Sequence, residues 1–352
     1  MKRILKGMGI LLLAVVILLV GLIAFLSITE YKPEETEPAS FVEADASAEP
    51  VDPDAVFTLC TWNVGYGGLG EESDFFMDGG EMVNPPSQEV VEKNLAGIEA
   101  HMQSNPADAW LLQEVDVNSA RSGFVDQRTR FGGIVGGNTA FAYNYKCKFV
   151  PIPLPPMGKV ESGIVTFTSA AMQADAQRIS LPCPFSWPVS AANLKRCLLV
   201  TRLPVKGSNK ELVIVNLHLE AYDDGEGRIA QSKMLMEFLE AEYAKGNYVI
   251  AGGDFNQAFP GTLEKYPIAE GAEWQPGQLE QAALSVGWEY AFDSSAATCR
   301  LLDKPYADDS QKYVIDGFIL SPNVQLVEVK TQDLGFAYAD HNPVRLQVRF
   351  AK

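Results

Sequence analysis

Hydrophobic residues follow two different patterns along this chain. Met8–Ile28 is an uninterrupted apolar run of 21 residues without a charged side chain. From residue 55 onwards, short apolar segments rich in β-branched residues alternate with Gly, Pro, Asn and Asp, a pattern typical of strands and turns. Ten of these segments are predicted to be strands: Val56–Asn63, Ala109–Val115, Thr139–Tyr145, Gly163–Thr168, Cys197–Leu203, Glu211–Leu219, Tyr248–Gly252, Tyr313–Leu320, Val324–Thr331 and Val344–Phe350.

Three other segments have apolar residues at the three- and four-residue spacing of a helix. They are Glu89–Gln103, Arg228–Lys245 and Gln278–Val286. The second ends at Lys245-Gly246, which is a helix stop signal. Ten strands are too many, and three helices too few, for a single doubly wound sheet. We therefore expect an α/β fold, a four-layer sandwich of two packed, mostly antiparallel β-sheets flanked by helices.

The first 28 residues predict a transmembrane helix that precedes this fold. Residues 1–7 contain Lys2, Arg3 and Lys6, and residues 8–28 would span about 31 Å as a helix, enough to cross a bilayer core. The basic end is expected in the cytoplasm, which makes the chain a single-pass protein of the cell membrane with its bulk outside. A cleavable signal peptide, giving a secreted protein, is the alternative, although Ile23–Ser27 is a poor cleavage site.

Residues 29–54 differ in composition from both neighbours. Between Glu30 and Asp54 the chain has nine acidic residues, one Lys and four Pro. Such a segment cannot bury a core of its own, so it is predicted to be a disordered, self-repelling tether. The folded domain is therefore expected at residues 55–352.

Composition excludes several classes of protein. The 352-residue chain has a formal charge of −17, with three His and five Cys. That charge gives no basic field for gripping nucleic acid, but it leaves a nucleic-acid substrate open, because bound divalent metals can supply local positive charge. The sequence has no Cys-x-x-Cys or His-Glu-x-x-His motif for zinc. Five Cys in this length do not make a disulfide scaffold. Cys60 is expected to be buried, and a disulfide between Cys183 and Cys197 stays open.

Polar residues stand at the ends of several predicted apolar strands. A single such group would be a turn former, but together they supply carboxylates, Asn side chains and two of the three His. Carboxylate and amide oxygens favour Mg²⁺, Mn²⁺ or Ca²⁺, and a His moves protons near neutral pH. The set indicates metal-assisted hydrolysis of a phosphate ester. The groups are Thr61-Trp62-Asn63, Gln113-Glu114-Val115, Asn216-Leu217-His218, Gly253-Asp254-Phe255-Asn256, Asp316-Gly317-Phe318 and Asp340-His341-Asn342.

The order of these groups resembles that of the endonuclease/exonuclease/phosphatase family. This family includes pancreatic-type deoxyribonucleases, bacterial sphingomyelinases, inositol-polyphosphate 5-phosphatases and abasic-site endonucleases. The resemblance extends from Val56 to Phe350. It implies that Glu114 is the principal metal carboxylate, that Asn63 lies beside it, and that Asp340 completes a site for Mg²⁺, or for Mn²⁺ or Ca²⁺.

The resemblance also implies catalytic roles. Asp254 would hold or activate the attacking water, and Asn256 would steady the phosphate or the metal. His341 would contact the scissile phosphate and would be oriented by Asp316. His218 would protonate the leaving oxygen. Abasic-site endonucleases generally lack this last His, so the chain is more similar to the other branches. His101 lies outside every group and is expected at the surface or at a helix C-cap.

Candidates for substrate binding lie mainly in loops. Gly65–Pro86 is a long, Gly-rich insertion, and its Asp78 belongs to a Phe-Phe-Met-Asp-Gly-Gly segment that is predicted to be either a surface loop or a substrate-selecting rim. Isolated Arg residues suit bidentate binding of phosphate. The four candidates are Asp78, Arg121, Asn144 and Arg300.

These features predict a divalent-metal-dependent phosphoesterase, either a phosphodiesterase or a phosphatase, on the outer side of the membrane. Its substrate would be a lipid head group, a sugar phosphate, a nucleotide or nucleic acid, and the protein is expected to be a monomer. Two alternatives stay open. One is an endonuclease of the same family, and the other is a catalytically silent, membrane-anchored binding module.

Overall fold

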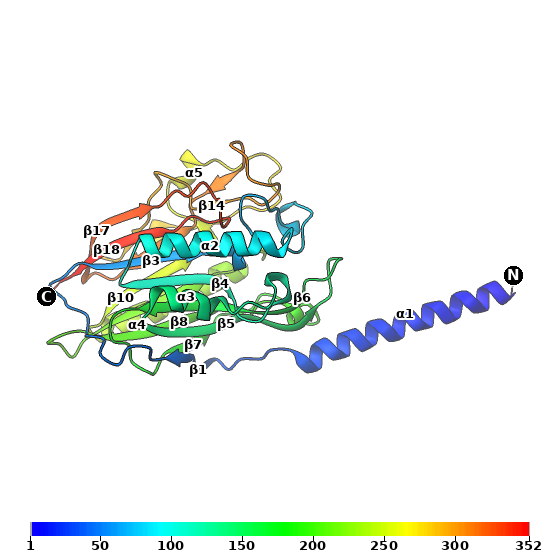
Figure 1. Cartoon of the computed structure of the whole chain (residues 1–352), viewed down its shortest axis with the longest axis horizontal. Helices are drawn as coiled ribbons and strands as arrows, with labels where there is room; N and C mark the ends of the chain where they lie inside the picture. The colour runs from blue at the N-terminus through cyan, green and yellow to red at the C-terminus, as the bar shows by residue number, and fades with distance from the viewer. Residues whose placement is uncertain (1, 352) are drawn as a thin grey trace.

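Two seven-stranded β-sheets form the body of the protein (Figure 1). The computed structural model describes residues 2–351. In order across the first sheet, the strands are β1 (Thr36–Pro38), β7 (Gln177–Ser180), β8 (Cys197–Pro204), β9 (Glu211–His218), β10 (Tyr248–Asp254), β16 (Asp316–Leu320) and β13 (Glu289–Ala291). Across the second sheet they are β17 (Val324–Thr331), β18 (Val344–Phe350), β3 (Phe57–Asn63), β4 (Ala109–Asp116), β6 (Gly158–Thr168), β5 (Asn138–Val150) and β2 (Ser40–Val42).

Most neighbouring strands are antiparallel, and the pairs β9–β10 and β3–β4 are parallel. Two short ladders lie outside the sheets: β11 (Gln257–Ala258) with β12 (Gly277–Gln278), and β14 (Cys299–Arg300) with β15 (Lys312–Tyr313). The expected α/β sandwich of two mostly antiparallel sheets is confirmed.

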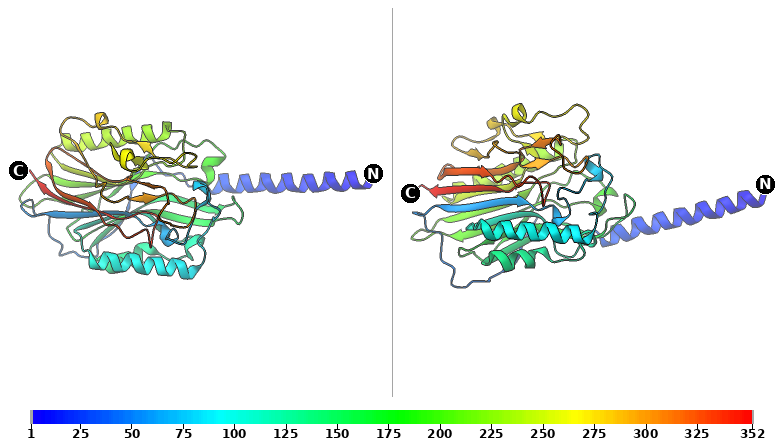
Figure 2. Two further views of the ribbon diagram at one scale, coloured as in Figure 1. Left: turned by 90° about the horizontal axis from the view of Figure 1, so that it is seen from above. Right: turned by 45° about the horizontal axis from the view of Figure 1, so that its top comes forward.

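The main core lies between the sheets, because alternate strand residues point inward from both of them. Leu59 and Leu111 of the second sheet and Leu199 and Ile214 of the first are fully buried in it. Helices cover the outer faces, α2 (Gln88–Ser104) and α3 (Gln127–Val135) on the second sheet and α4 (Glu226–Ala244) on the first (Figure 2). The remaining helix of the body, α5 (Thr262–Lys265), is one turn long.

Three elements differ from the sequence prediction. Gln278–Val286 contains only a 3₁₀ turn, Gln281–Ala283, because Gln278 is drawn into β12 and leaves too few residues for a stable helix. The predicted strand Tyr313–Leu320 is divided between β15 and β16. The helix α3 was not predicted, since Gly132-Gly133 interrupts its short apolar pattern.

The acidic segment before the domain is ordered, which differs from the predicted disordered tether. Its β1 pairs with β7 and its β2 pairs with β5, so it adds an edge strand to each sheet. Further along, Val51 bridges to Val205 and is buried. The charge and composition of the segment predict disorder. They carry no information about the two open sheet edges, whose unpaired backbone groups can bind this segment.

The helix α1 (Lys2–Thr29) extends away from the sandwich (Figures 1 and 2). Its residues Arg3–Thr29 are long and apolar enough to cross a membrane, a property that a signal sequence shares. The five cysteines are free: Cys183 is exposed while Cys197 is buried, and the disulfide that the sequence left open is not formed. Cys60 is buried, as predicted.

Candidate active site

The strand β10 places a carboxylate at the centre of one edge of the first sheet. Asp254, its last residue, is paired in register with His218 of β9 and with Asp316 of β16. Three chemically active residues therefore lie side by side at the same level of the sheet. The approach of the strands is close, because a Cβ on Gly253 would lie 1.9 Å from the main-chain oxygen of Leu217.

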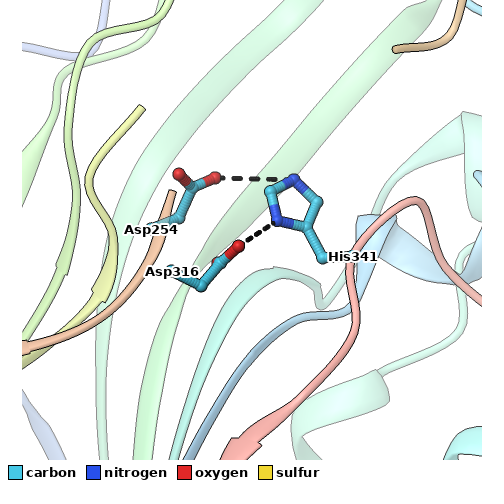
Figure 3. A group of neighbouring side chains, drawn as sticks. All are labelled: Asp254, Asp316 and His341. Carbon is cyan, nitrogen blue, oxygen red and sulfur yellow. Dashed lines mark hydrogen bonds and ion pairs between the residues drawn. The ribbon is translucent and has the colours of Figure 1, made fainter. Parts of the chain in front are cut away.

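His341 joins this row from the loop before β18 (Figure 3). Its Nδ1 lies 2.8 Å from Oδ2 of Asp316, and its Nε2 lies 3.7 Å from Oδ2 of Asp254. The same Asp254 oxygen lies 3.4 Å from Nε2 of His218. The Trp62 indole donates to the main-chain oxygen of His341 at 2.8 Å and so fixes the loop.

The second sheet contributes the acid and the amide of the predicted metal site. Asn63 ends β3, and its Nδ2 donates to Glu114 at 3.2 Å and to Asp254 at 3.0 Å, so it connects the two sheets at this edge. Glu114 has a φ of +56° at an irregularity of the β4–β6 ladder. A bulge of this kind redirects a side chain, here into the cavity, and the strained backbone is typical of a functional position.

Asp340 fits a divalent cation together with Glu114. It is buried, and its Oδ1 has no hydrogen-bond partner among the described residues. The pKa of this carboxyl is raised to about 7, because burial and the charge of Glu114 raise it more than His341 lowers it. A cation held between Glu114 and Asp340 would neutralise this uncompensated charge. Hard carboxylate oxygens with an Asn beside them suit Mg²⁺, Mn²⁺ or Ca²⁺.

A second group of possible ligand atoms is formed by Asp254, Asp316 and His341, within 4.8 Å of one another. In this group Nδ1 of His341 already bonds Asp316, and Asp254 accepts from the Asn63 amide and from the main-chain nitrogen of Asn256. These contacts occupy much of the donor capacity of the group. The predicted metal residues Glu114 and Asp340 lie outside this group.

The pKa values of the two His residues are shifted in opposite directions. Burial lowers the pKa of His218 well below its usual value, and the charges of Arg196 and His341 lower it further. Burial also acts against a charged His341, but the carboxylates of Asp316, Asp254 and Asp340 dominate and raise its pKa well above the usual value. These directions favour the neutral form of His218 and the protonated form of His341. The sequence prediction gave the proton-donating role to His218, and the charges around it favour His341 instead.

Most of the predicted site residues line one cavity of about 410 Å³. Asp316 lies behind His341, and the remaining predicted catalytic and metal residues line the cavity: Asn63, Glu114, His218, Asp254, Asn256, Asp340 and His341. Asn256 has a φ of +51° and donates to the main-chain oxygen of Leu219, which fixes its side chain.

The substrate-binding candidates have different fates. Asp78 lines the cavity and accepts from Tyr222, and burial raises its pKa to about 6. Asn144 also lines the cavity, and its side-chain oxygen accepts a hydrogen bond from the main-chain nitrogen of Cys197. Arg121 reaches the cavity wall, although a two-point ion pair with Asp116 offsets its charge.

Arg300 was expected to bind phosphate and is instead structural. Its guanidinium donates to the main-chain oxygens of Gly70 and Ser73 at 2.8 and 2.9 Å, and also to those of Leu301 and Lys304. These bonds fasten the Gly65–Pro86 insertion to the β14 ladder. Among the described residues, Arg300 is not part of the cavity lining.

Sequence reasoning missed several residues around the site. Tyr222 and Trp274 line the cavity and come from loops without a recognisable pattern. Gln113 and Asn216 were included in the strand-end groups but lie between the sheets, where Nε2 of Gln113 donates to Oδ1 of Asn216 at 2.8 Å. His101 is half-buried against Trp62, rather than at the surface as one of its two predicted locations had it.

Paired His, buried carboxylates and Asn at one edge of a two-sheet sandwich place this protein in the class of metal-dependent phosphoester hydrolases. The chain belongs to the Endonuclease/Exonuclease/phosphatase family, whose sequence model matches residues 60–304. Asp316, Asp340 and His341 lie beyond the matched residues, and the fold brings them to the same cavity. No curated protein matches the chain.

Solved structures share the fold at low identity. An endonuclease/exonuclease/phosphatase from Beutenbergia cavernae is 17% identical, with a TM-score of 0.58, covering 84% of this chain and 72% of that one. The corresponding protein from Bacteroides vulgatus is 15% identical, with a TM-score of 0.53, covering 84% of this chain and 100% of that one. Truncated TDP2 from Caenorhabditis elegans is 15% identical, with a TM-score of 0.50, covering 84% and 98%.

Proposed function

We propose that this protein is a divalent-metal-dependent phosphodiesterase or phosphatase, anchored by α1 with its catalytic domain on the outer side of the membrane. The observation that carries the proposal is the position of Asp254 between two His residues, 3.4 Å from Nε2 of His218 and 3.7 Å from Nε2 of His341. A carboxylate placed between a neutral and a charged imidazole can handle protons on both sides of a reacting phosphate.

The metal would be held by Glu114 and Asp340, with Asn63 beside them. When bound, it supplies positive charge to the phosphate oxygens. Asn63 supports this site, because its amide donates both to Glu114 and to Asp254 and so fixes the positions of the two carboxylates relative to each other. We propose Mg²⁺ as the cation, with Mn²⁺ or Ca²⁺ as substitutes.

Protons are handled by the row of residues on β9, β10 and the His341 loop. Asp254 orients the attacking water and accepts its proton, with neutral His218 as the neighbouring acceptor. His341 contacts the scissile phosphate as an imidazolium and donates its Nε2 proton to the leaving oxygen. Asp316 orients His341 through Nδ1, and Asn256 steadies the phosphate.

The test is a substrate panel on the full chain in detergent. It includes a phosphomonoester, bis(4-nitrophenyl) phosphate, plasmid DNA and a phospholipid, each with Mg²⁺, Mn²⁺, Ca²⁺ or EDTA. We expect metal-dependent release of product from at least one ester and loss of that activity in EDTA. Cleavage of DNA alone would support a nuclease, and no hydrolysis of any substrate would support a binding module and contradict the proposal.

A further inference from the structure

We propose that the mouth of the catalytic cavity docks onto the bilayer that α1 enters, so that the enzyme hydrolyses phosphate esters of membrane lipids. This inference rests on the proposed function and names its substrate class. It is carried by the position of the cavity relative to α1, by the exposed apolar side chains around the cavity, and by the absence of acidic residues from two of the segments that bear them.

The cavity and α1 lie at the same end of the sandwich. Asn63 is the last residue of β3, and β18 runs antiparallel to it, so the C-terminus lies at the end opposite to the active site. In Figures 1 and 2, α1 leaves the body on the side away from the C-terminus. A bilayer crossed by α1 would therefore face the active-site end and not the opposite end of the body.

The end of α1 packs directly on the cavity wall. Leu22 and Leu26 belong to one apolar cluster with Val150 and Met157, and the last two also line the cavity. Lys195 pairs with Glu30 just after the helix, at 3.0 Å. These contacts hold the domain close to α1, so the cavity mouth cannot be far from the membrane surface.

The length of α1 places the boundary of the membrane close to Trp187. A bilayer core takes about 20 helical residues, and 20 residues counted from Met8 end at Ser27. The hydroxyl of Ser27 accepts a hydrogen bond of 2.9 Å from the indole of Trp187. Trp side chains concentrate at the interface between lipid and water, so Trp187 stands at the depth where such a residue is most stable.

Exposed apolar side chains surround the mouth of the cavity. Ten large apolar side chains of the described residues outside α1 are exposed. Three of these ten line the cavity, and Leu154 and Trp187 lie two residues from lining positions. We call these five residues the apolar rim: Met77, Ile152, Leu154, Trp187 and Val189. Leu154 is 83% exposed and Trp187 is 61% exposed. Exposing apolar surface to water costs free energy, and insertion of these side chains into lipid would remove that cost.

Two of the three rim segments, the one that bears Ile152 and Leu154 and the one that bears Trp187 and Val189, lack acidic residues, whereas the segment around Met77 is acidic. Residues 145–160 carry three Lys and residues 181–198 carry one Lys and one Arg, and neither segment has an Asp or Glu, although the whole chain has a net charge of −17. Basic residues near a membrane are attracted to anionic head groups. Lys195 and Arg196 pair with Glu30 and Glu220, so it is the apolar character of these two segments and their lack of acidic side chains that suits a lipid surface.

The walls of the cavity fit an amphipathic ester. Metal and His residues form its polar part, and Phe75, Phe76, Val150, Met157 and Leu194 supply apolar wall on the way to the rim. A lipid phosphate can reach the polar part while its glycerol and acyl groups follow the apolar wall to the bilayer. Hydrolysis then forms a bond between the water oxygen and phosphorus and breaks the bond between phosphorus and the leaving oxygen; the water proton goes to Asp254, and His341 protonates the leaving oxygen.

Docking is tested by the fluorescence of Trp187. The other four Trp residues are buried, so the difference between wild type and Trp187→Phe isolates the signal of the rim. The full chain is reconstituted into vesicles of phosphatidylcholine and phosphatidylglycerol, with brominated phosphatidylcholine as the quencher and co-flotation as the control for insertion. We expect strong quenching of the Trp187 component. A Trp187 signal that bromine leaves unchanged would overturn the docking proposal.

Substrate class is tested in the same vesicles with Leu154→Glu and Trp187→Glu. The matched control is Val286→Glu, which places the same charge at a fully exposed apolar position before β13. That position lies at the opposite end of the sandwich, because Glu289 pairs with Leu320, the far end of β16 from Asp316. Bis(4-nitrophenyl) phosphate in the aqueous phase reports the catalytic site itself.

We expect both rim variants to lower phospholipid hydrolysis at least about tenfold, with hydrolysis of the soluble ester within about twofold of wild type. Val286→Glu should change neither rate. Equal phospholipid hydrolysis by the rim variants and wild type would overturn the substrate proposal, as would a wild type that hydrolyses only the soluble ester. A wild type that hydrolyses neither ester contradicts the proposed function itself, and the quenching result still decides whether the rim enters the bilayer.

Discussion

The carboxylate of Asp316 lies 2.8 Å from Nδ1 of His341, and both side chains are buried. Because this contact occupies Nδ1, the ring presents Nε2 to the cavity, where Asp254 and Asp340 lie 3.7 and 3.8 Å away. The pair therefore determines which nitrogen faces the cavity, and the Asp316 carboxylate raises the pKa of the ring. His218 Nε2 lies 3.4 Å from Oδ2 of Asp254, and burial lowers the pKa of its ring well below the usual value.

Replacing Asp316 by Asn should lower turnover about 10²-fold or more on every substrate, because the imidazole loses its orientation and its charge partner. Asp316 raises the pKa of His341. A donor must be protonated, so activity falls as the pH rises above this pKa, and Asp316→Asn should move the alkaline limb of the pH–rate profile to lower pH. Asp309→Asn, at an exposed ion pair with Lys304, is the control. An alkaline limb that stays in place would refute the assigned role.

The two His residues should differ in their dependence on the leaving group. His341→Ala should lower turnover at least about tenfold more on an alkyl phosphate ester than on its nitrophenyl counterpart, since nitrophenolate leaves without a proton. His218→Ala should lower both rates by the same factor, because its neutral ring acts on the side of the attacking water. The measurement is the ratio of kcat on the matched pair of esters. The reverse pattern would return the role of proton donor to His218.

The sequence predicted the sandwich because its buried strands are short, β-branched and separated by turn residues. Nine of the ten predicted strands correspond to strands of the two sheets, and the tenth is divided. The errors have local causes. Gln278–Val286 has helical spacing but too little length after β12 begins, and the acidic segment becomes ordered only because sheet edges that form elsewhere in the chain are available to it.

The site was predictable where its chemistry sits at strand ends. Asp254 and His218 reach the cavity because they end neighbouring strands, which the sequence shows. The opposite pKa shifts of the two His were not predictable, because the shift of His341 depends on three carboxylates brought around it from separate loops and strands. The structural role of Arg300 depends on carbonyl groups about 230 residues earlier in the chain, a relationship that no local pattern reveals.

Metal binding should be detectable by stability as well as by activity. Because Glu114 and Asp340 gather uncompensated acidic charge, Mg²⁺ should raise the Tm of the wild type. A ligand at 100 times its Kd adds about 2.7 kcal/mol to the free energy of unfolding. Glu114→Gln should abolish most of this shift, and Glu72→Gln, whose partner is the exposed Lys93, should retain it. An unchanged Mg²⁺ shift in Glu114→Gln would contradict the assignment of the metal site.

Glu242 should make stability depend on acid pH. Burial opposes its charge, but hydrogen bonds from Arg202, Lys245 and Asn247 lower its pKa to about 2. A lowered pKa contributes stability that is present above the unfolded value near 4.5 and is lost as the pH falls towards 2. Glu242→Gln should cost about 2 kcal/mol at pH 7 in urea unfolding. The cost should shrink below about pH 4.5. The exposed Glu237→Gln on the same helix should show little effect at any pH.

The most direct measurement compares wild type and Asp254→Asn in full-length form. The assay is the hydrolysis of whichever ester in the substrate panel gives the highest wild-type rate, in Mg²⁺ and in EDTA. The account predicts turnover that EDTA abolishes, together with a loss of about 10²-fold or more in Asp254→Asn at an unchanged Tm. Hydrolysis that persists in EDTA, or an Asp254→Asn protein as active as wild type, would contradict it.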